Sequence, residues 1–151
     1  MSRAIIRTMN IVLAAILAGV SFGIWIGFNP QNLSPSTYVG QQQNMLHSLR
    51  VLMVVLVVAA TIITLTLAFL ERRDKPVSMG LLAAAGLFIA CIVITAFGNK
   101  PIDDIMLTWN SASLPANWTE LRDRWWTLHI WRAVVELAAL FVVTWTSVKK
   151  G

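Results

Sequence analysis

The sequence has little charge and few side chains suited to metal binding or acid–base chemistry. Charged residues make up 13% of its 151 residues, against about 25% in ordinary soluble domains. Because Cys91 is the only cysteine, an intrachain disulfide and a structural zinc site built on several thiolates are excluded. There are only two histidines. Because such residues are scarce, each polar residue inside an apolar run is a candidate for a functional site.

Hydrophobic residues are abundant, at 57%, and they occur in long runs. A bilayer core requires about 20 consecutive apolar residues. The first run follows Arg3 and Arg7 and could be mistaken for a signal peptide. Its apolar core is longer than the usual signal-peptide core of about 7–15 residues, so we interpret it as a retained helix. The pattern predicts one all-α domain over residues 1–151, an integral membrane four-helix bundle with apolar runs at 5–28, 49–70, 77–97 and 128–148.

The net charge of +5 comes from basic residues at the ends of these runs, which indicates membrane topology and no nucleic-acid partner. We predict that both termini and the 71–76 turn face the cytoplasm of a plasma or inner membrane, and that connections 29–48 and 98–127 face outward. The inner group is Arg3, Arg7, Arg72, Arg73, Lys75, Lys149 and Lys150. The outer group is Arg50, Lys100, Arg122 and Arg124, offset by Asp103, Asp104, Glu120 and Asp123.

The last connection is long and structured. Its segment Asn117-Trp118-Thr119-Glu120 fits a capping box, so the final helix is expected over 118–148, beginning before its apolar run. Pro101 and Pro115 break the segment before it, and residues 101–109 are predicted to form a short helix across the outer mouth. We expect Asp103 and Asp104 to be solvated there. This part would cap the bundle.

The stretch RDRWWTLHIWRAVVE, residues 122–136, carries polar residues into the last apolar run. Every third or fourth residue is polar or aromatic, and these five fall within an arc of about 80° on a helix: Arg122, Trp125, His129, Arg132 and Glu136. An ionisable residue at membrane depth costs about 2.5–3.5 kcal/mol. Two interpretations stay open, an Arg132–Glu136 pair that only orients helices and a functional site.

Polar residues from the other helices stand at the same depth. Gln43, Asn44 and His47 precede the 49–70 run, and Asn99 follows the 77–97 run. The sequence therefore predicts a polar, Trp-lined pocket at the outer end, with Gln43, Asn44, His47, Asn99, Arg122 and Trp125 as substrate-binding residues. His47 and His129 could also hold a metal or haem between two helices. Neither belongs to an HxxxH or ExxH pair, so the metal signal is weak.

The segments GNKPIDDIMLTWN and LPANWTELRDRWWTLHIWR resemble the anthrone oxygenase-like family of four-helix membrane proteins. The matching positions are Asn99, Pro101, Ile102, Arg122 or Arg124, Trp125, His129 and Arg132. Asp103 departs from the pattern, because an Asn often stands there. The resemblance implies a monooxygenase that converts a tricyclic anthrone to an anthraquinone with O2.

For that reaction, the resemblance implies that His129 is the general base, with Glu136 as the competing candidate. Arg132 and Arg122 would stabilise an oxyanion or superoxide, Asn99 would bond a carbonyl or phenol, and Trp125 would pack on the rings.

Two other functions remain open. The protein could be a non-enzymatic membrane subunit or a lipid- or small-molecule-binding protein, or it could be a metal or haem protein using both histidines. The cofactor is left unassigned, with none, a metal or haem as the alternatives. The expected partners are membrane lipid, a hydrophobic small molecule, and a second copy of the chain or another membrane protein.

Overall fold

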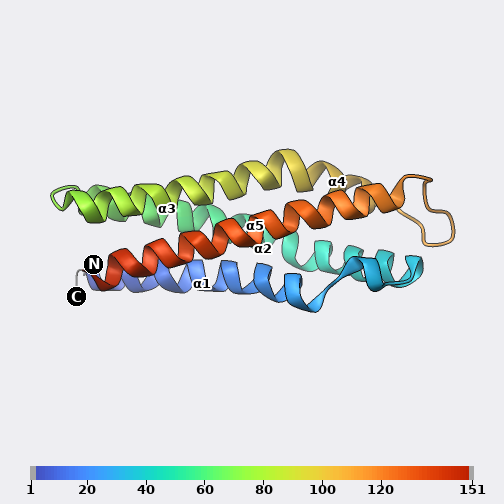
Figure 1. Cartoon of the computed structure of the whole chain (residues 1–151), viewed down its shortest axis with the longest axis horizontal. Coiled ribbons are helices and arrows are strands. Elements are labelled where there is room, and N and C mark those ends of the chain that lie inside the picture. The colour runs from blue at the N-terminus through green and yellow to red at the C-terminus, as the bar shows by residue number, and fades with distance from the viewer. Residues whose placement is uncertain (1–2, 150–151) are drawn as a thin grey trace.

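The structure is a computed structural model that describes residues 3–149 as an elongated bundle of antiparallel helices (Figure 1). The elements are α1 (Arg3–Gly27), a 3-10 turn (Pro30–Asn32), α2 (Pro35–Leu70), α3 (Lys75–Val93), a π-helical segment (Ile94–Asn99), α4 (Lys100–Met106) and α5 (Trp118–Val148). Four of the helical stretches are long and apolar enough to cross a membrane. The predicted all-α, four-helix membrane architecture is confirmed.

Each long helix has two neighbours. Helix α1 packs against α2 and α5, and α3 packs against the same two helices. Helices α2 and α5 thus lie on opposite sides of the bundle axis, with α1 and α3 between them. A polar residue on the inner face of α5 therefore points toward α2 across the interior.

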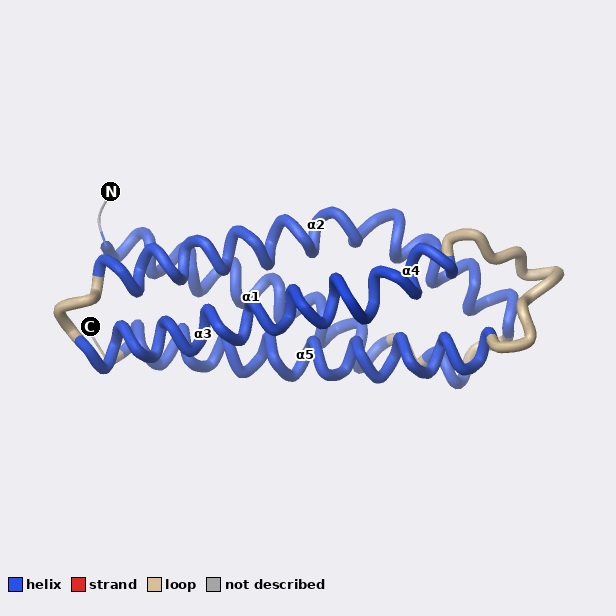
Figure 2. The backbone as a smooth tube through the Cα atoms, turned by 90° about the horizontal axis from the view of Figure 1, so that it is seen from above, coloured by secondary structure: helices blue, strands red, loops and turns tan. Residues whose placement is uncertain are grey.

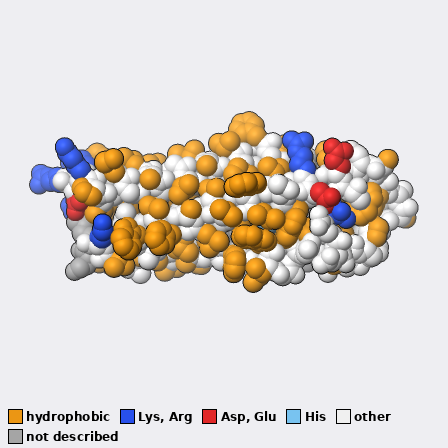
Figure 3. All heavy atoms as spheres, viewed as in Figure 1, with side chains coloured by type: hydrophobic (Ala, Val, Ile, Leu, Met, Phe, Trp, Pro, Cys, Tyr) orange, Lys and Arg blue, Asp and Glu red, His pale blue; other side chains and the backbone are white. Residues whose placement is uncertain are grey.

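Both termini and the α2–α3 turn lie at one end, which we call the inner end, and the α4–α5 loop lies at the other, the outer end (Figures 1 and 2). Hydrophobic side chains cover the middle of the face drawn in Figure 3, with basic side chains at the inner end and charges of both signs toward the outer end. Lys150, counted above in the inner basic group, lies outside the described residues. Which end faces the cytoplasm remains a prediction.

A buried ion pair ties α1 to α2 at the inner end. The carboxylate of Glu71 is 1% exposed and accepts a hydrogen bond from Arg7 at 2.6 Å, with Arg3 at 3.5 Å. A carboxylate taken out of water needs such compensation. Two basic residues of the predicted inner group therefore also stabilise the fold.

Helix α2 begins well before its apolar run. Ser34 is its N-cap, accepting a hydrogen bond from the Thr37 amide at 3.3 Å, and Pro35 occupies the first turn, where its missing N–H costs nothing. The added turns bury Tyr38 and Gln42. The outer end is therefore a packed extension of the bundle rather than a loop laid over it.

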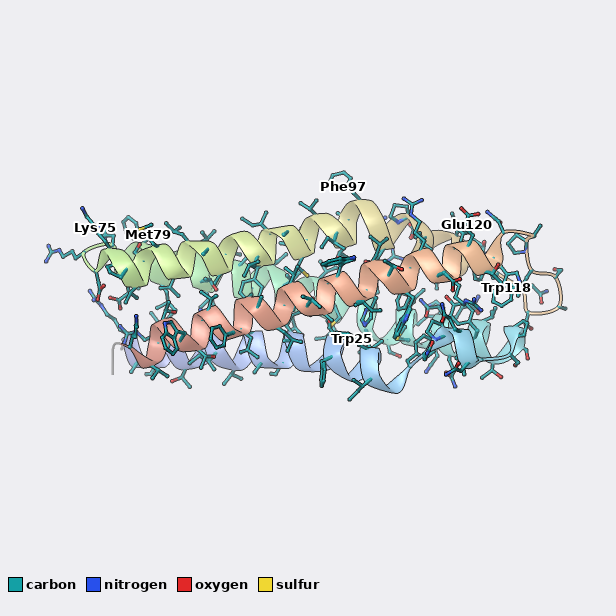
Figure 4. All side chains as sticks on the ribbon, viewed as in Figure 1. Trp25, Lys75, Met79, Phe97, Trp118 and Glu120 are labelled. Atoms are coloured by element: carbon teal, nitrogen blue, oxygen red, sulfur yellow. The ribbon has the colours of Figure 1, made fainter. Side chains whose placement is uncertain are left out.

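The chain after α3 continues as a helix. The π-helical segment joins α3 to α4 without a break, so α4 prolongs the direction of α3 (Figure 1). The predicted short helix across the outer mouth is therefore wrong. Phe97 bulges outward from this segment and is 79% exposed (Figure 4). Helix α5 begins at Trp118, as predicted, but its N-cap Asn117 makes no side-chain capping bond within the described chain.

Gly80 marks a close approach of α3 and α5. A Cβ added there would meet the Cγ2 methyl of Thr146, with the two atoms too close for an ordinary contact. We expect Gly80→Ala to lower the melting temperature in detergent, because overpacking a filled contact typically costs about 1–3 kcal/mol. Thr146→Ser in the same chain removes the offending methyl and should restore stability. A Gly80→Ala protein as stable as wild type would show that α3 and α5 can move apart without loss of stability.

Candidate functional site

The polar stripe of α5 faces the interior of the bundle. Trp125, His129 and Glu136 are all buried, with exposed fractions of 3%, 0% and 1%. Ala133 lies on the same buried face. Trp118 and Glu120, labelled in Figure 4, mark the outer start of the same helix. The stripe is therefore an inner wall and not a lipid-facing surface.

Glu136 stands at the centre of the site. Its Oε1 accepts a hydrogen bond from the Cys91 thiol at 3.0 Å and lies 3.8 Å from Nε of Arg132. Its Oε2 has no hydrogen bond of good geometry among the described residues, although the Ser21 hydroxyl lies beside this carboxyl group, and the Arg132 Nε proton is likewise unbonded there. One carboxylate oxygen is thus held by the protein, and the other is left available beside a guanidinium.

His129 is held at both ring nitrogens. Arg132 Nη2 lies 3.0 Å from Nδ1, and the Ser21 carbonyl lies 3.1 Å from Nε2. A guanidinium only donates, so Nδ1 must accept, and Nε2 must carry the proton that it donates to the carbonyl of α1. This geometry fixes His129 as the neutral Nε2–H tautomer, bridging α1 to Arg132.

The histidine ring also stacks on two tryptophans. Its centroid lies 5.3 Å from that of Trp125, with an angle of 4° between the planes, and 5.6 Å from that of Trp126, with an angle of 17°. Trp125 Nε1 donates to Asp103 Oδ1 at 2.6 Å, and Asn99 Nδ2 donates to the Trp125 carbonyl at 3.2 Å. Bonds from α4 and the π-helical segment therefore fix the ring stack.

A cavity of about 130 Å³ opens beside this wall. The α5 and α3–α4 side of the cavity is polar and includes Cys91, Thr95, Asp103, Arg132 and Glu136, with the indole of Trp125. The facing side is apolar and comes from α1 and α2, with Leu17, Ile24, Leu46, Leu49, Met53 and Val57. A ligand in this cavity would meet ionisable groups on one side and aliphatic groups on the other.

The outer rim of the cavity carries an ion-pair cluster. Asp104 accepts from Arg50 at 2.6 Å and from Lys100 at 2.9 Å, and both cations also line the cavity. The cluster joins α2 to α4 across the cavity rim. Because Asp104 is half exposed, these pairs add little stability, and their side chains can rearrange at modest cost.

The structure brings some of the predicted site residues together and leaves others apart. Glu136, Arg132 and Trp125 line the cavity, whereas His129 and Asn99 lie directly behind that wall. Gln43 donates instead to the backbone carbonyls of Met106 and Trp109, at 3.0 and 2.9 Å. Arg122 bonds Asp123 at 2.8 Å and covers the Trp118 ring. Asn44 and His47 are exposed on α2.

The two histidines occupy different surroundings, one exposed and one buried with both nitrogens engaged. In the described part of the chain, no three His, Cys, Asp or Glu side chains are grouped so that they could hold a metal ion.

Sequence reasoning missed three residues of the site. Asp103 was expected to be solvated, but it is 6% exposed and bonded to Trp125. Its departure from the Asn of the resembling pattern was the available signal. The sequence marks Cys91 only as one position in an apolar run, but its thiol donates to Glu136. Thr95 lines the cavity from the first turn of the π-helical segment, which no local pattern predicted.

One known protein family matches this chain. A sequence profile described as anthrone oxygenase matches residues 43–142. The match extends from the outer part of α2 through α3 and α4 into α5, and so it includes the polar wall of the cavity. Searches of curated proteins and of solved structures return no significant match. On this evidence, the chain belongs to the anthrone oxygenase family of membrane proteins.

Proposed function

We propose that this protein is a membrane oxidoreductase that uses O2 to oxidise a hydrophobic aromatic substrate, anthrone-like or quinol-like, that carries an acidic proton. One observation carries the proposal: the free Oε2 of Glu136, buried in a cavity wall beside Arg132. A buried carboxylate with one unbonded oxygen is suited to accept a proton from a bound molecule. The family match supports the same class of chemistry.

The reaction follows from the two side chains. Glu136 accepts the acidic C–H or O–H proton, and the Arg132 guanidinium stabilises the resulting delocalised anion. That anion passes an electron to O2. For an anthrone, the carbon radical and superoxide combine into a C–O bond, and loss of the second C–H proton with O–O cleavage gives the ketone and water. One oxygen atom enters the product, and the other leaves as water.

The neighbouring residues support this pair. In the proposal Trp125 offers an indole face to the substrate ring, Cys91 orients Glu136 through Oε1, and His129 positions Arg132. Glu136 takes the role of base in preference to His129, because the Nδ1 lone pair of His129 is already used by Arg132. Gln43, Asn44, His47 and Arg122 lie outside the cavity wall, and no step of the proposal uses them.

Oxygen uptake by the purified protein tests the proposal. The protein in nanodiscs is supplied in turn with anthrone and with an alkyl hydroquinone, and each rate is compared with that of empty nanodiscs. Protein-dependent uptake with either substrate, with the matching quinone as product, is the expected result. Uptake equal to the blank with both substrates, together with stable co-purification of another membrane protein, would favour the membrane-subunit alternative.

His129 provides a second test, because a base and a positioning residue respond differently to glutamine. The side chain of Gln can both accept from Arg132 and donate to the Ser21 carbonyl, so we expect His129→Gln to lower turnover by less than about tenfold. Loss of the base itself would cost about 100-fold or more. His129→Ala, which leaves Arg132 without its partner, should be worse than His129→Gln. If His129→Gln is as inactive as a Glu136 variant, His129 is the base.

A further inference from the structure

The size of the cavity narrows the substrate class. Ligand sites for drug-sized molecules span roughly 300–1,000 Å³, whereas this cavity is about 130 Å³. An apolar protein cavity of about 150 Å³ holds one benzene ring. We infer that the natural substrate presents a single aromatic ring to this cavity, as an alkyl-substituted hydroquinone. The oxidation of this substrate rests on the proposed function, but the binding of a single ring in the cavity does not.

The two walls determine how such a ring lies. On the α2 side, Met53 and Val57 are buried and offer only methyl and thioether contacts. On the α5 side, Glu136 and Arg132 offer their unbonded Oε2 and Nε. A ring hydroxyl turned toward α5 would satisfy both polar atoms, while the ring edge packs on α2. This orientation would give a hydrogen-bond partner to two buried atoms, Oε2 of Glu136 and Nε of Arg132, that lack one in the described residues.

Part of the α2 side of the cavity wall is exposed, and we place the exit of an alkyl chain there. Val54 lines the cavity and is also 46% exposed. Its neighbours on the outside of α2, Val51 and Val55, are 74% and 58% exposed in a helix apolar enough to cross a membrane. An opening beside Val54 would face the acyl chains of the bilayer. A ring with an aliphatic tail matches both the cavity and the opening.

Oxidation of such a substrate balances without a further reactant. A hydroquinone transfers two electrons and two protons to O2, which forms the quinone and hydrogen peroxide. Glu136 accepts one phenolic proton as the first electron leaves, and Arg132 stabilises the phenolate. The peroxide product distinguishes this reaction from anthrone oxidation, which releases water.

Val57 sets the size of the cavity in this account, because it is buried in the wall opposite the polar residues. Val57→Phe should fill the ring site, and Val57→Ala should enlarge it. Val58 is the matched control, since it is the next residue on α2 but is 40% exposed and not in the cavity wall. Val58→Phe adds the same side chain at a lipid-facing position.

Binding tests the inference without requiring turnover. The full-length protein in nanodiscs is titrated with 4-nonylphenol as the one-ring probe and with 2-hydroxyanthracene as the three-ring probe. The dissociation constants are measured by equilibrium dialysis against protein-free nanodiscs. We expect 4-nonylphenol to bind wild type and Val58→Phe at least about tenfold more tightly than Val57→Phe, and Val57→Ala to gain affinity for 2-hydroxyanthracene.

The outcomes separate this inference from the proposed function. Tighter binding of 2-hydroxyanthracene than of 4-nonylphenol to wild type would overturn the one-ring inference, and so would equal binding of 4-nonylphenol by Val57→Phe and wild type. If Val57→Phe does not fold, wild type is compared with Val57→Ala. Equal affinity of these two proteins for 2-hydroxyanthracene would then overturn the one-ring inference. One-ring binding without oxygen uptake on any substrate would overturn the proposed function and leave this inference standing.

Discussion

Replacing Glu136 by glutamine is expected to lower oxygen-dependent turnover by about 10²–10⁴-fold in a protein that remains folded. Glutamine keeps the shape of the side chain and an oxygen that can accept from the Cys91 thiol, now at 3.0 Å from Oε1. It cannot accept a proton at the position of Oε2, so the first step of the reaction is lost. Initial rates of oxygen uptake, measured beside the melting temperature, give the result.

Glu71→Gln is the matched control. Glu71 is also a buried carboxylate paired with an arginine, but it lies at the inner end, far along the bundle from the cavity. Its replacement should lower stability and leave turnover of the folded fraction unchanged. Full turnover by Glu136→Gln would show that Glu136 is not the base. Equal loss of turnover in Glu136→Gln and Glu71→Gln would show that the loss comes from damage to the fold.

Replacing Arg132 by methionine is expected to affect both turnover and stability. Methionine keeps an apolar stem but removes the cation that lies 3.0 Å from His129 Nδ1 and 3.8 Å from Glu136 Oε1. Loss of one preorganised charge at a developing anion typically lowers turnover by about 10²–10³-fold. Loss of one partner of a buried ion pair destabilises by about 3–5 kcal/mol, because the other charge stays buried without compensation. Turnover and thermal unfolding are measured on the same preparation.

The double variant Arg132→Met, Glu136→Met separates the two effects. It removes both charges, so it should recover much of the stability lost in Arg132→Met, because an apolar replacement of a buried pair is often tolerated. It should not recover turnover. A double variant no more stable than Arg132→Met alone would mean that the loss comes from packing and not from the unpaired carboxylate.

The architecture could be predicted because bilayer thickness limits the length of apolar runs. The inward stripe of Trp125, His129 and Glu136 also followed from spacing along one helix. The start of α5 at Trp118 was predicted from a capping box, although Asn117 makes no side-chain capping bond in the described chain. These features depend on the local chain and on the cost of placing charge in lipid. They require no knowledge of how helices pack against one another.

The remainder of the site depends on packing between helices, which spacing does not determine. The 49–70 run is apolar all round, so its rotation about its own axis could not be derived. The structure turns Asn44 and His47 outward and Met53 and Val57 into the cavity. Asp103 is buried because α4 continues the axis of α3, through a π-helical segment that has no local sequence signal.

In the proposed reaction, Glu136 takes a proton from an aromatic acid bound in the cavity. This proton transfer is tested most directly by the absorption spectrum of 4-nitrophenol, whose ionised form absorbs visible light, bound to the protein at a pH where the free phenol is mostly neutral. We expect a phenolate band on binding to wild type and the spectrum of the neutral phenol on binding to Glu136→Gln. A phenolate band of equal strength in Glu136→Gln, or none in wild type with the phenol bound, would contradict it.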